Sequence, residues 1–261
     1  MSLATSPAIL LRSHPYSESS RILRFLTPDH GIVALVGRGV RKGGSRGRGA
    51  LDTFGRGTLV FTHRPDRDLH NLRDFTPEGA SLGLGRDLRR FYGASIVAEI
   101  LLLHALEEGD RALFDWVAEV FGRLGTAPDA DVPGWIVSGA WRTLALLGFP
   151  PELERCVQCG GTLGVGDGEE MDRFDVSEGG LRCVRCATGG ASMPRVGPRA
   201  REQLAFLVAG RPPHPLTHPA SHLGLVEGFA LHHLGARREF RSFPVLKDLL
   251  TRTGAADQDR M

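Results

Sequence analysis

The 261-residue sequence lacks the short motifs that would mark it as a metal-dependent hydrolase or a nucleotide-binding enzyme. It contains no HExxH helix motif and no GxxxxGK[ST] phosphate loop. It has few cysteines, and all four fall in two CxxC pairs, so none is left over as a nucleophile. These absences favour a binding protein over an enzyme.

Long apolar runs are also missing. The longest, about residues 94–106, is interrupted by Glu99 and His104 and is too short to span a bilayer. Residues 1–5 lack the charged and apolar regions of a secretion signal, so we expect a cytoplasmic protein. The net charge is only +2, but residues 1–80 carry 12 Lys and Arg against 7 Asp and Glu. The basic excess therefore lies in the first third of the chain.

The cysteine pairs are the most specific feature that is present. Four thiolates at Cys156, Cys159, Cys183 and Cys186 match the tetrahedral shell of one structural zinc ion, and no ligand position is left open for water. Glycines flank both pairs, as tight turns require. Two disulfides or a redox-active pair are the alternatives, but cytosolic disulfides are rare and no βαβ pattern surrounds either pair.

The first 80 residues predict short strands separated by turns. Apolar segments at 8–11, 21–26, 32–36, 58–62 and 69–75 are divided by turn residues such as Pro28-Asp29-His30-Gly31. Five short strands in this length predict a small β-barrel of the oligonucleotide/oligosaccharide-binding (OB) type.

From about residue 80 the apolar spacing becomes helical. It runs to Gly148-Phe149-Pro150-Pro151 and resumes after Pro194. The sequence therefore predicts an α+β multidomain protein: an OB barrel at 1–79, a helical domain at 80–151 and 192–255, and a four-cysteine zinc module inserted at 152–191.

A Gly/Arg-rich stretch at residues 37–49 is the second notable feature. It holds five cations and no acid, and its glycines allow a backbone to approach phosphates closely. On a barrel loop this pattern predicts a nucleic-acid contact, although a solvated loop is the simpler alternative. Further arginines could extend the surface, and the barrel aromatics could stack on bases, although core packing is the expected role of each aromatic. The arginines are Arg12, Arg21, Arg24, Arg56, Arg64 and Arg67, and the aromatics are Tyr16, Phe25, Phe54, Phe61 and Phe75.

Four segments together resemble the RecO family of bacterial recombination mediators over nearly the whole chain. They are HPYSESSRILRFLTPDHGIVALVGRGVRKGGSRGRGALDTF, GFPPELERCVQCG, FDVSEGGLRCVRC and LHHLGARREFRSFPVLKDLL. The resemblance implies a nucleoid-associated DNA-repair protein without catalytic residues. Such a protein binds single- and double-stranded DNA, anneals complementary strands, and helps load the RecA recombinase on strands coated by single-strand-binding protein, together with RecR.

The resemblance also carries site residues onto this sequence. It implies one structural Zn²⁺ on the four cysteines. It places the DNA-binding surface on the basic barrel residues Arg38, Arg41, Lys42, Arg46 and Arg48. Of the arginines that could extend this surface, we add Arg21 and Arg24 to the predicted nucleic-acid-binding residues.

Three other functions remain open from the residues alone. They are an RNA-binding or translation-associated protein built from an OB domain and a zinc ribbon, a zinc-dependent hydrolase, and a scaffold that uses its barrel for protein contacts. A closed shell of four thiolates argues against the hydrolase.

Overall fold

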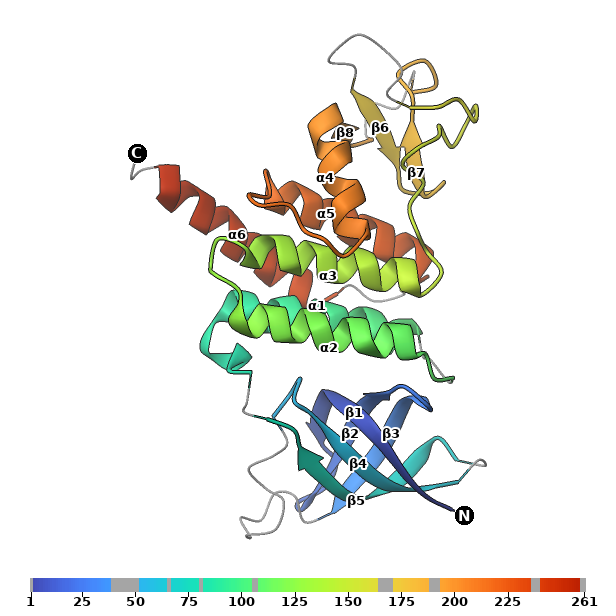
Figure 1. The fold of residues 1–261 in the computed structure, drawn as a ribbon, viewed down its shortest axis with the longest axis vertical. Coiled ribbons are helices and arrows are strands. Elements are labelled where there is room, and N and C mark those ends of the chain that lie inside the picture. The colour runs from blue at the N-terminus through green and yellow to red at the C-terminus, as the bar shows by residue number, and fades with distance from the viewer. Residues whose placement is uncertain are drawn as a thin grey trace. The chain divides into compact units, whose positions relative to one another are not determined.

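The computed structural model describes residues 2–38, 52–64, 67–79, 82–104, 108–163, 171–187, 193–235 and 240–258. The chain divides into two compact units, residues 1–86 with 104–126 and residues 87–103 with 127–261. The first is a β-barrel with one long helix, and the second combines helices with a small sheet (Figure 1).

The barrel consists of five strands closed in the order β1-β2-β3-β5-β4. Only the β3–β5 pairing is parallel among these described strands. Each strand expected from the sequence lies within an observed one, and the OB-type barrel is confirmed. The strands are β1 (Ser2–Pro15), β2 (Ser20–Thr27), β3 (Gly31–Arg38), β4 (Arg56–His63) and β5 (Leu69–Pro77).

Strict alternation of burial builds the barrel core. Along β3, every second residue from Gly31 to Gly37 is buried, as expected for a strand with one face inside. β1 closes the barrel because Ser2–Ile9 pair with β4 and Ile9–Pro15 pair with β2, with an irregularity between Leu10 and Arg12. The inward side chains are Ala8, Leu10, Leu23, Phe25, Val33, Leu35, Leu59, Phe61 and Phe75.

Helix α2 (Arg111–Thr126) packs against the barrel within the first unit. The rings of Phe121 and Phe54 are 5.1 Å apart, and the Arg56 guanidinium lies 5.8 Å from the ring centre of Phe114. The compact unit thus joins α2 to the barrel, whereas the sequence pattern assigned residues 80–151 to the helical domain. The three-part domain division stays a prediction.

The second unit is built on buried, apolar helices. At position 93 of α1 a Cβ atom would lie 2.6 Å from Cγ1 of Ile136 in α3, so Gly93 allows these helices to approach closely. No helix in the described ranges is long and apolar enough to cross a membrane. The helices are α1 (Leu88–His104), α3 (Val132–Leu146), α4 (Pro198–Val208), α5 (Pro219–His233) and α6 (Ser242–Gln258), and the 3₁₀ turn η1 (Leu84–Arg86) precedes them.

A three-stranded sheet packs on these helices in the order β7-β6-β8. Its strands are β6 (Asp172–Asp175), β7 (Gly180–Arg182) and β8 (Arg195–Val196). The ring of Phe174 in β6 lies 6.1 Å from Trp141 of α3 and 6.1 Å from Phe229 of α5. One face of the small sheet is therefore part of the core of the second unit.

Candidate metal centre and nucleic-acid interface

Each CxxC pair forms a tight turn that folds its two sulfur atoms to the same side. In the first turn, the Gly160 amide donates to the Cys156 carbonyl at 2.8 Å, and the Cys156 amide donates to the Gly161 carbonyl at 2.8 Å. Gly160 adopts a positive φ of 71°, which glycine allows at low cost. In the second turn, the amides of Cys186 and Ala187 both donate to the Cys183 carbonyl at 3.0 Å.

The two turns bring all four sulfur atoms together. The four Sγ atoms lie within 4.8 Å of one another, and Cys159 Sγ is 3.9 Å from Cys183 Sγ. A disulfide would need about 2.05 Å, whereas sulfurs around a tetrahedral zinc ion are separated by about 3.8 Å, given Zn–S bonds of about 2.3 Å. The arrangement is therefore that of a metal-ligand shell, as the spacing predicts, and these cysteines could hold one metal ion.

The electrostatics of the thiols agree with a site that needs a cation. Burial raises the pKa of Cys156, but hydrogen bonds from the amides of Cys183, Cys159 and Gln158 outweigh it and lower that pKa to about 6. Hydrogen bonds to the neighbouring Cys159 and Cys183 raise the pKa of Cys186 to about 12. Without a cation, the crowded thiols cannot all ionise. A divalent cation at the centre would favour the thiolate form of all four residues.

A buried ion pair ties the first cysteine turn to the small sheet. Asp175 accepts hydrogen bonds from the Ser177 amide at 2.9 Å and the Glu178 amide at 3.1 Å, and forms an ion pair with Arg182. Burial raises the pKa of Asp175, but these donors and the Arg182 charge outweigh it and leave that pKa below its usual value. Arg182 in turn donates to Gln158 Oε1, inside the first turn, at 2.8 Å.

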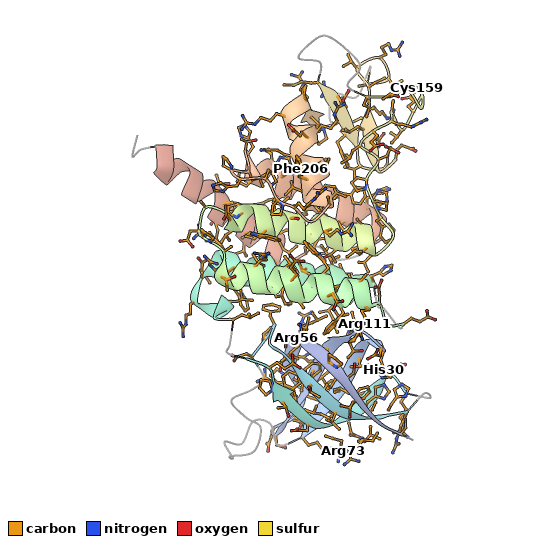
Figure 2. The ribbon with its side chains drawn as sticks, viewed as in Figure 1. His30, Arg56, Arg73, Arg111, Cys159 and Phe206 are labelled. Carbon is orange, nitrogen blue, oxygen red and sulfur yellow. The ribbon has the colours of Figure 1, made fainter. Side chains whose placement is uncertain are left out.

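A close backbone approach also fixes the first turn against β7. The Leu181 amide donates to the Glu152 carbonyl at 3.0 Å, and the Val157 amide donates to the Leu181 carbonyl at 2.9 Å. A Cβ atom at position 180 would lie 2.5 Å from the Glu152 carbonyl, so Gly180 cannot carry a side chain without displacing the backbone. Figure 2 shows Cys159 in this module, where its thiol is exposed.

On the barrel, strand pairing brings two arginines face to face. Arg24 of β2 stands directly opposite Arg12 of β1, and both side chains are exposed. Like charges in this position are destabilising unless an anion lies between them. Because Leu23 and Phe25 point into the barrel, the arginine pair lies on its outer surface.

The sequence-predicted basic residues divide into three groups in the structure. Arg38, at the end of β3, is exposed on the same outer face as Arg24, because its partner Ser20 is an even number of residues from Arg24. Arg21 is an odd number of residues from Arg24 and therefore lies on the other face of β2. Its Nε donates to Ser13 Oγ at 2.7 Å. The others, Arg41, Lys42, Arg46 and Arg48, lie outside the described residues.

The basic stretch also contains a bare GxSxG pattern at residues 43–47. In hydrolases this pattern marks a nucleophile only on a turn between a strand and a helix. Here it lies between β3 and β4, two strands of the barrel. The pattern therefore does not point to a catalytic serine.

Among the five barrel aromatics, one is available for stacking. Phe25, Phe54, Phe61 and Phe75 are buried, as the core interpretation expects. Tyr16 is 61% exposed in the β1–β2 turn, where its amide donates to the Ser20 carbonyl at 3.0 Å. Ser20 is the partner of Arg38, so an exposed aromatic ring and an exposed cation belong to the same end of the β2–β3 pair.

From the sequence, Arg12 is one of six arginines that could extend the basic surface, with nothing to distinguish it from the others. Its importance depends on the Arg12–Arg24 pairing, which the irregularity after Leu10 determines. Composition and alternation contain no signal for a shift of one residue in strand register.

Comparisons with known proteins agree with this architecture. The family model for the recombination protein O N-terminal region matches residues 1–79, and the model for its C-terminal region matches residues 85–237. A protein of Anaeromyxobacter dehalogenans strain 2CP-C, named DNA repair protein RecO, is 31% identical over 248 residues, which is 90% of this chain and 93% of the relative. Two more proteins with that name, from Desulfatibacillum aliphaticivorans and a Nocardioides species, are each 30% identical. They cover 95% and 78% of this chain, and 98% and 81% of their own lengths.

Proposed function

The chain belongs to the RecO family of DNA repair and recombination proteins, and from this premise we propose that it is a non-enzymatic DNA-binding mediator. It binds single- and double-stranded DNA in the cytoplasm, at the nucleoid, and anneals complementary strands. With RecR, it helps load RecA on strands coated by single-strand-binding protein. The family assignment supports the repair role, and the barrel surface supports the DNA contact.

The observation that carries the proposal is the exposed Arg12–Arg24 pair on the outer face of an OB-type barrel. In this fold, the surface over strands 2 and 3 is where oligonucleotides bind. A phosphate between the two guanidinium groups converts a repulsive pair into two charge-assisted hydrogen-bonding partners. Arg38 and the exposed ring of Tyr16 extend this surface toward the β1–β2 turn.

Annealing requires no bond chemistry. Two polyanionic strands must approach each other, and arginine side chains reduce their repulsion while the bases pair. Phosphate contacts carry no base information, so binding should be tolerant of sequence. Each contact releases counterions, so affinity should fall steeply with salt.

We propose that the four-cysteine centre holds one Zn²⁺ ion with a structural role. Four thiolate ligands leave no position for water or substrate, and zinc is the metal most often bound by such a pair of turns. The ion would join residues 152–163 to the hairpin of β6 and β7. In this proposal the module spanning 152–191 is an insertion in the helical domain.

Fluorescence anisotropy of labelled DNA over a salt series tests the proposal. The wild-type chain should bind single-stranded DNA, with affinity falling between about 50 and 200 mM salt. Arg24→Glu should weaken binding at least about tenfold and reduce the slope against log salt by about 0.7 or more. This substitution should not unfold the barrel, because it places a carboxylate opposite Arg12.

Arg123→Glu is the matched control. It changes the net charge equally but lies on α2, with a side chain 58% exposed. Equal losses in both variants, or salt-insensitive binding by the wild type, would contradict the proposal. Tighter binding to RNA than to DNA would favour the alternative of an RNA-binding protein.

A further inference from the structure

The small sheet carries a row of three arginines on neighbouring strands. Arg173 of β6 stands directly opposite Arg182 of β7 on one side and Arg195 of β8 on the other. Directly paired residues project to the same face of a sheet. Their sequence neighbours Phe174, Leu181 and Val196 are buried, so the arginine row lies on the face that is turned away from the helices.

Two of these guanidinium groups are held in place by the module itself. Arg182 forms an ion pair with Asp175 and donates to Gln158, and its side chain is 22% exposed. Arg173 is half-buried and donates to the Met193 carbonyl at 2.9 Å. Asp175 is the one carboxylate among the described residues that an arginine of the row contacts. One acid faces three cations, so the row keeps an excess of positive charge.

Arg195 is the exposed end of the row. Within the described residues, it has no hydrogen-bonding or ionic partner. A cation left unpaired directly opposite another cation is unfavourable, and an anionic ligand would reverse the sign of this interaction.

The start of α4 adds to the same positive field. β8 ends at Val196, and Gly197 is the N-cap of α4 without a side-chain hydrogen bond to the free amides. The first turn of this 11-residue helix contains no acid, and Arg199 within it is exposed. A helix N-terminus attracts anions through these amides and through the helix dipole.

We propose that the outer face of the β7-β6-β8 sheet is a second phosphate-binding surface, which holds single-stranded DNA through Arg173 and Arg195. The inference rests on the proposed DNA-binding function. It adds a contact in a different compact unit from the barrel. Guanidinium groups form bidentate hydrogen bonds with phosphate oxygens, and these contacts do not depend on base identity. This surface therefore suits a strand of any sequence. A protein that anneals two strands gains from a second surface, because each strand can then occupy its own site.

Photocrosslinking on the full chain tests direct contact. The probe is a single-stranded oligonucleotide of about 20 nucleotides in which 5-iodouracil replaces some thymines, a length above one OB-fold site. Crosslinked peptides are identified by mass spectrometry. The wild type should give crosslinks in the peptides that contain Met171 or Met193, since both residues flank the arginine row.

Arg195→Glu should lower these crosslinks by at least about threefold while crosslinks to barrel peptides persist. Arg211→Glu is the control, because it changes the charge equally at the opposite end of α4, and it should leave both sets unchanged. Arg24→Glu should lower the barrel crosslinks, so that crosslinks near Met193 make up a larger share of the total than in the wild type.

Two results overturn the inference, and they are distinguishable from failure of the proposed function. Barrel crosslinks without any in residues 171–196 show that the small sheet does not contact DNA although the protein binds it. Crosslinks there that survive Arg195→Glu show that the contact does not depend on the arginine row. Absence of all DNA binding by the wild type removes the proposed function, and this inference with it.

Discussion

The barrel and the small sheet place arginines directly opposite one another, but they stabilise this arrangement differently. The barrel pair, Arg12 and Arg24, lies outside a closed five-stranded barrel whose core of nine buried residues needs no help from the surface. The small sheet has strands of two to four residues, and its row includes an arginine with a buried acid partner. A large core tolerates uncompensated charge, whereas the small sheet has a buried ion pair within it and the cluster of four cysteines beside it.

The largest difference in stability between the small sheet and the barrel should follow the loss of one metal ligand. Cys159→Ser should abolish binding of one zinc ion per chain and unfold the module, because metal binding supplies much of the folding free energy of small four-cysteine units. Zinc content and hydrogen exchange measure this, and exchange in barrel amides should not change. Val184→Ser, in the second turn with a side chain 41% exposed, should retain zinc. A zinc-free Cys159→Ser chain with normal protection in β6 and β7 would contradict the stabilising role of the metal.

The second prediction concerns the ion pair. Asp175→Asn keeps an oxygen that can accept hydrogen bonds from Ser177 and Glu178 but leaves the Arg182 charge without its partner. Removing one member of a buried pair costs about 3 kcal/mol. Denaturant unfolding of the second unit should show that loss. On the barrel, Arg12→Gln removes one member of the exposed pair and should show none. An equal loss in both variants would eliminate the proposed distinction between the sheets.

The third prediction uses pH. Burial, together with repulsion from His218, lowers the pKa of His222 in α5 to about 4 from 6.5. The unfolded chain therefore takes up this proton first. The contribution of the neutral, buried His222 to the stability of the second unit is complete above pH 6.5 and is lost as pH falls toward 4. By pH 5 the second unit should lose roughly 2 kcal/mol through this residue.

The barrel contains a weaker counterpart of this histidine. Burial, with repulsion from His63 and His30, lowers the pKa of His70. Thermal unfolding between pH 7 and 5 should therefore affect the second unit more than the barrel. His222→Leu should flatten the pH dependence of the second unit. An unchanged pH slope in His222→Leu would show that another group is responsible.

The smallest effect should come from relief of the exposed pair. Arg12→Gln should raise barrel stability by no more than about 0.5 kcal/mol, since repulsion across a solvated strand pair is weak. Its DNA affinity should nevertheless decrease, with a salt slope smaller by about 0.7. Parallel unfolding and anisotropy measurements would separate the two effects. A large gain in stability without a loss of affinity would mean that the pair has no ligand.

The sequence allowed prediction of features that repeat locally. Short apolar segments divided by turn residues located all five barrel strands, and the Cys156–Cys159 and Cys183–Cys186 spacings predicted the sulfur cluster that the structure shows. It did not predict which residues face each other across strands. Arg173 and Arg195 are separated by a long segment, and their pairing depends on how β8 returns to β6.

The packing partner of α2 also could not be predicted from the sequence. Its apolar residues, such as Phe114 and Phe121, predict a helix with one buried face. Periodicity does not identify what that face packs against. In the structure, the ring of Phe54 packs against Phe121, and the Arg56 guanidinium lies over the ring of Phe114.

The double pairing of β1 has a consequence for assembly. Since β1 bonds to β4 along its first half and to β2 along its second, the five described barrel strands form a ring without a free edge. An extended peptide from a partner protein therefore cannot join the barrel as a sixth strand, and two copies cannot associate edge to edge. Partners of this barrel must recognise its side chains. In the small sheet the outer edge of β7 is occupied as well, because the backbone of Glu152 and Val157 bonds to Leu181 along it.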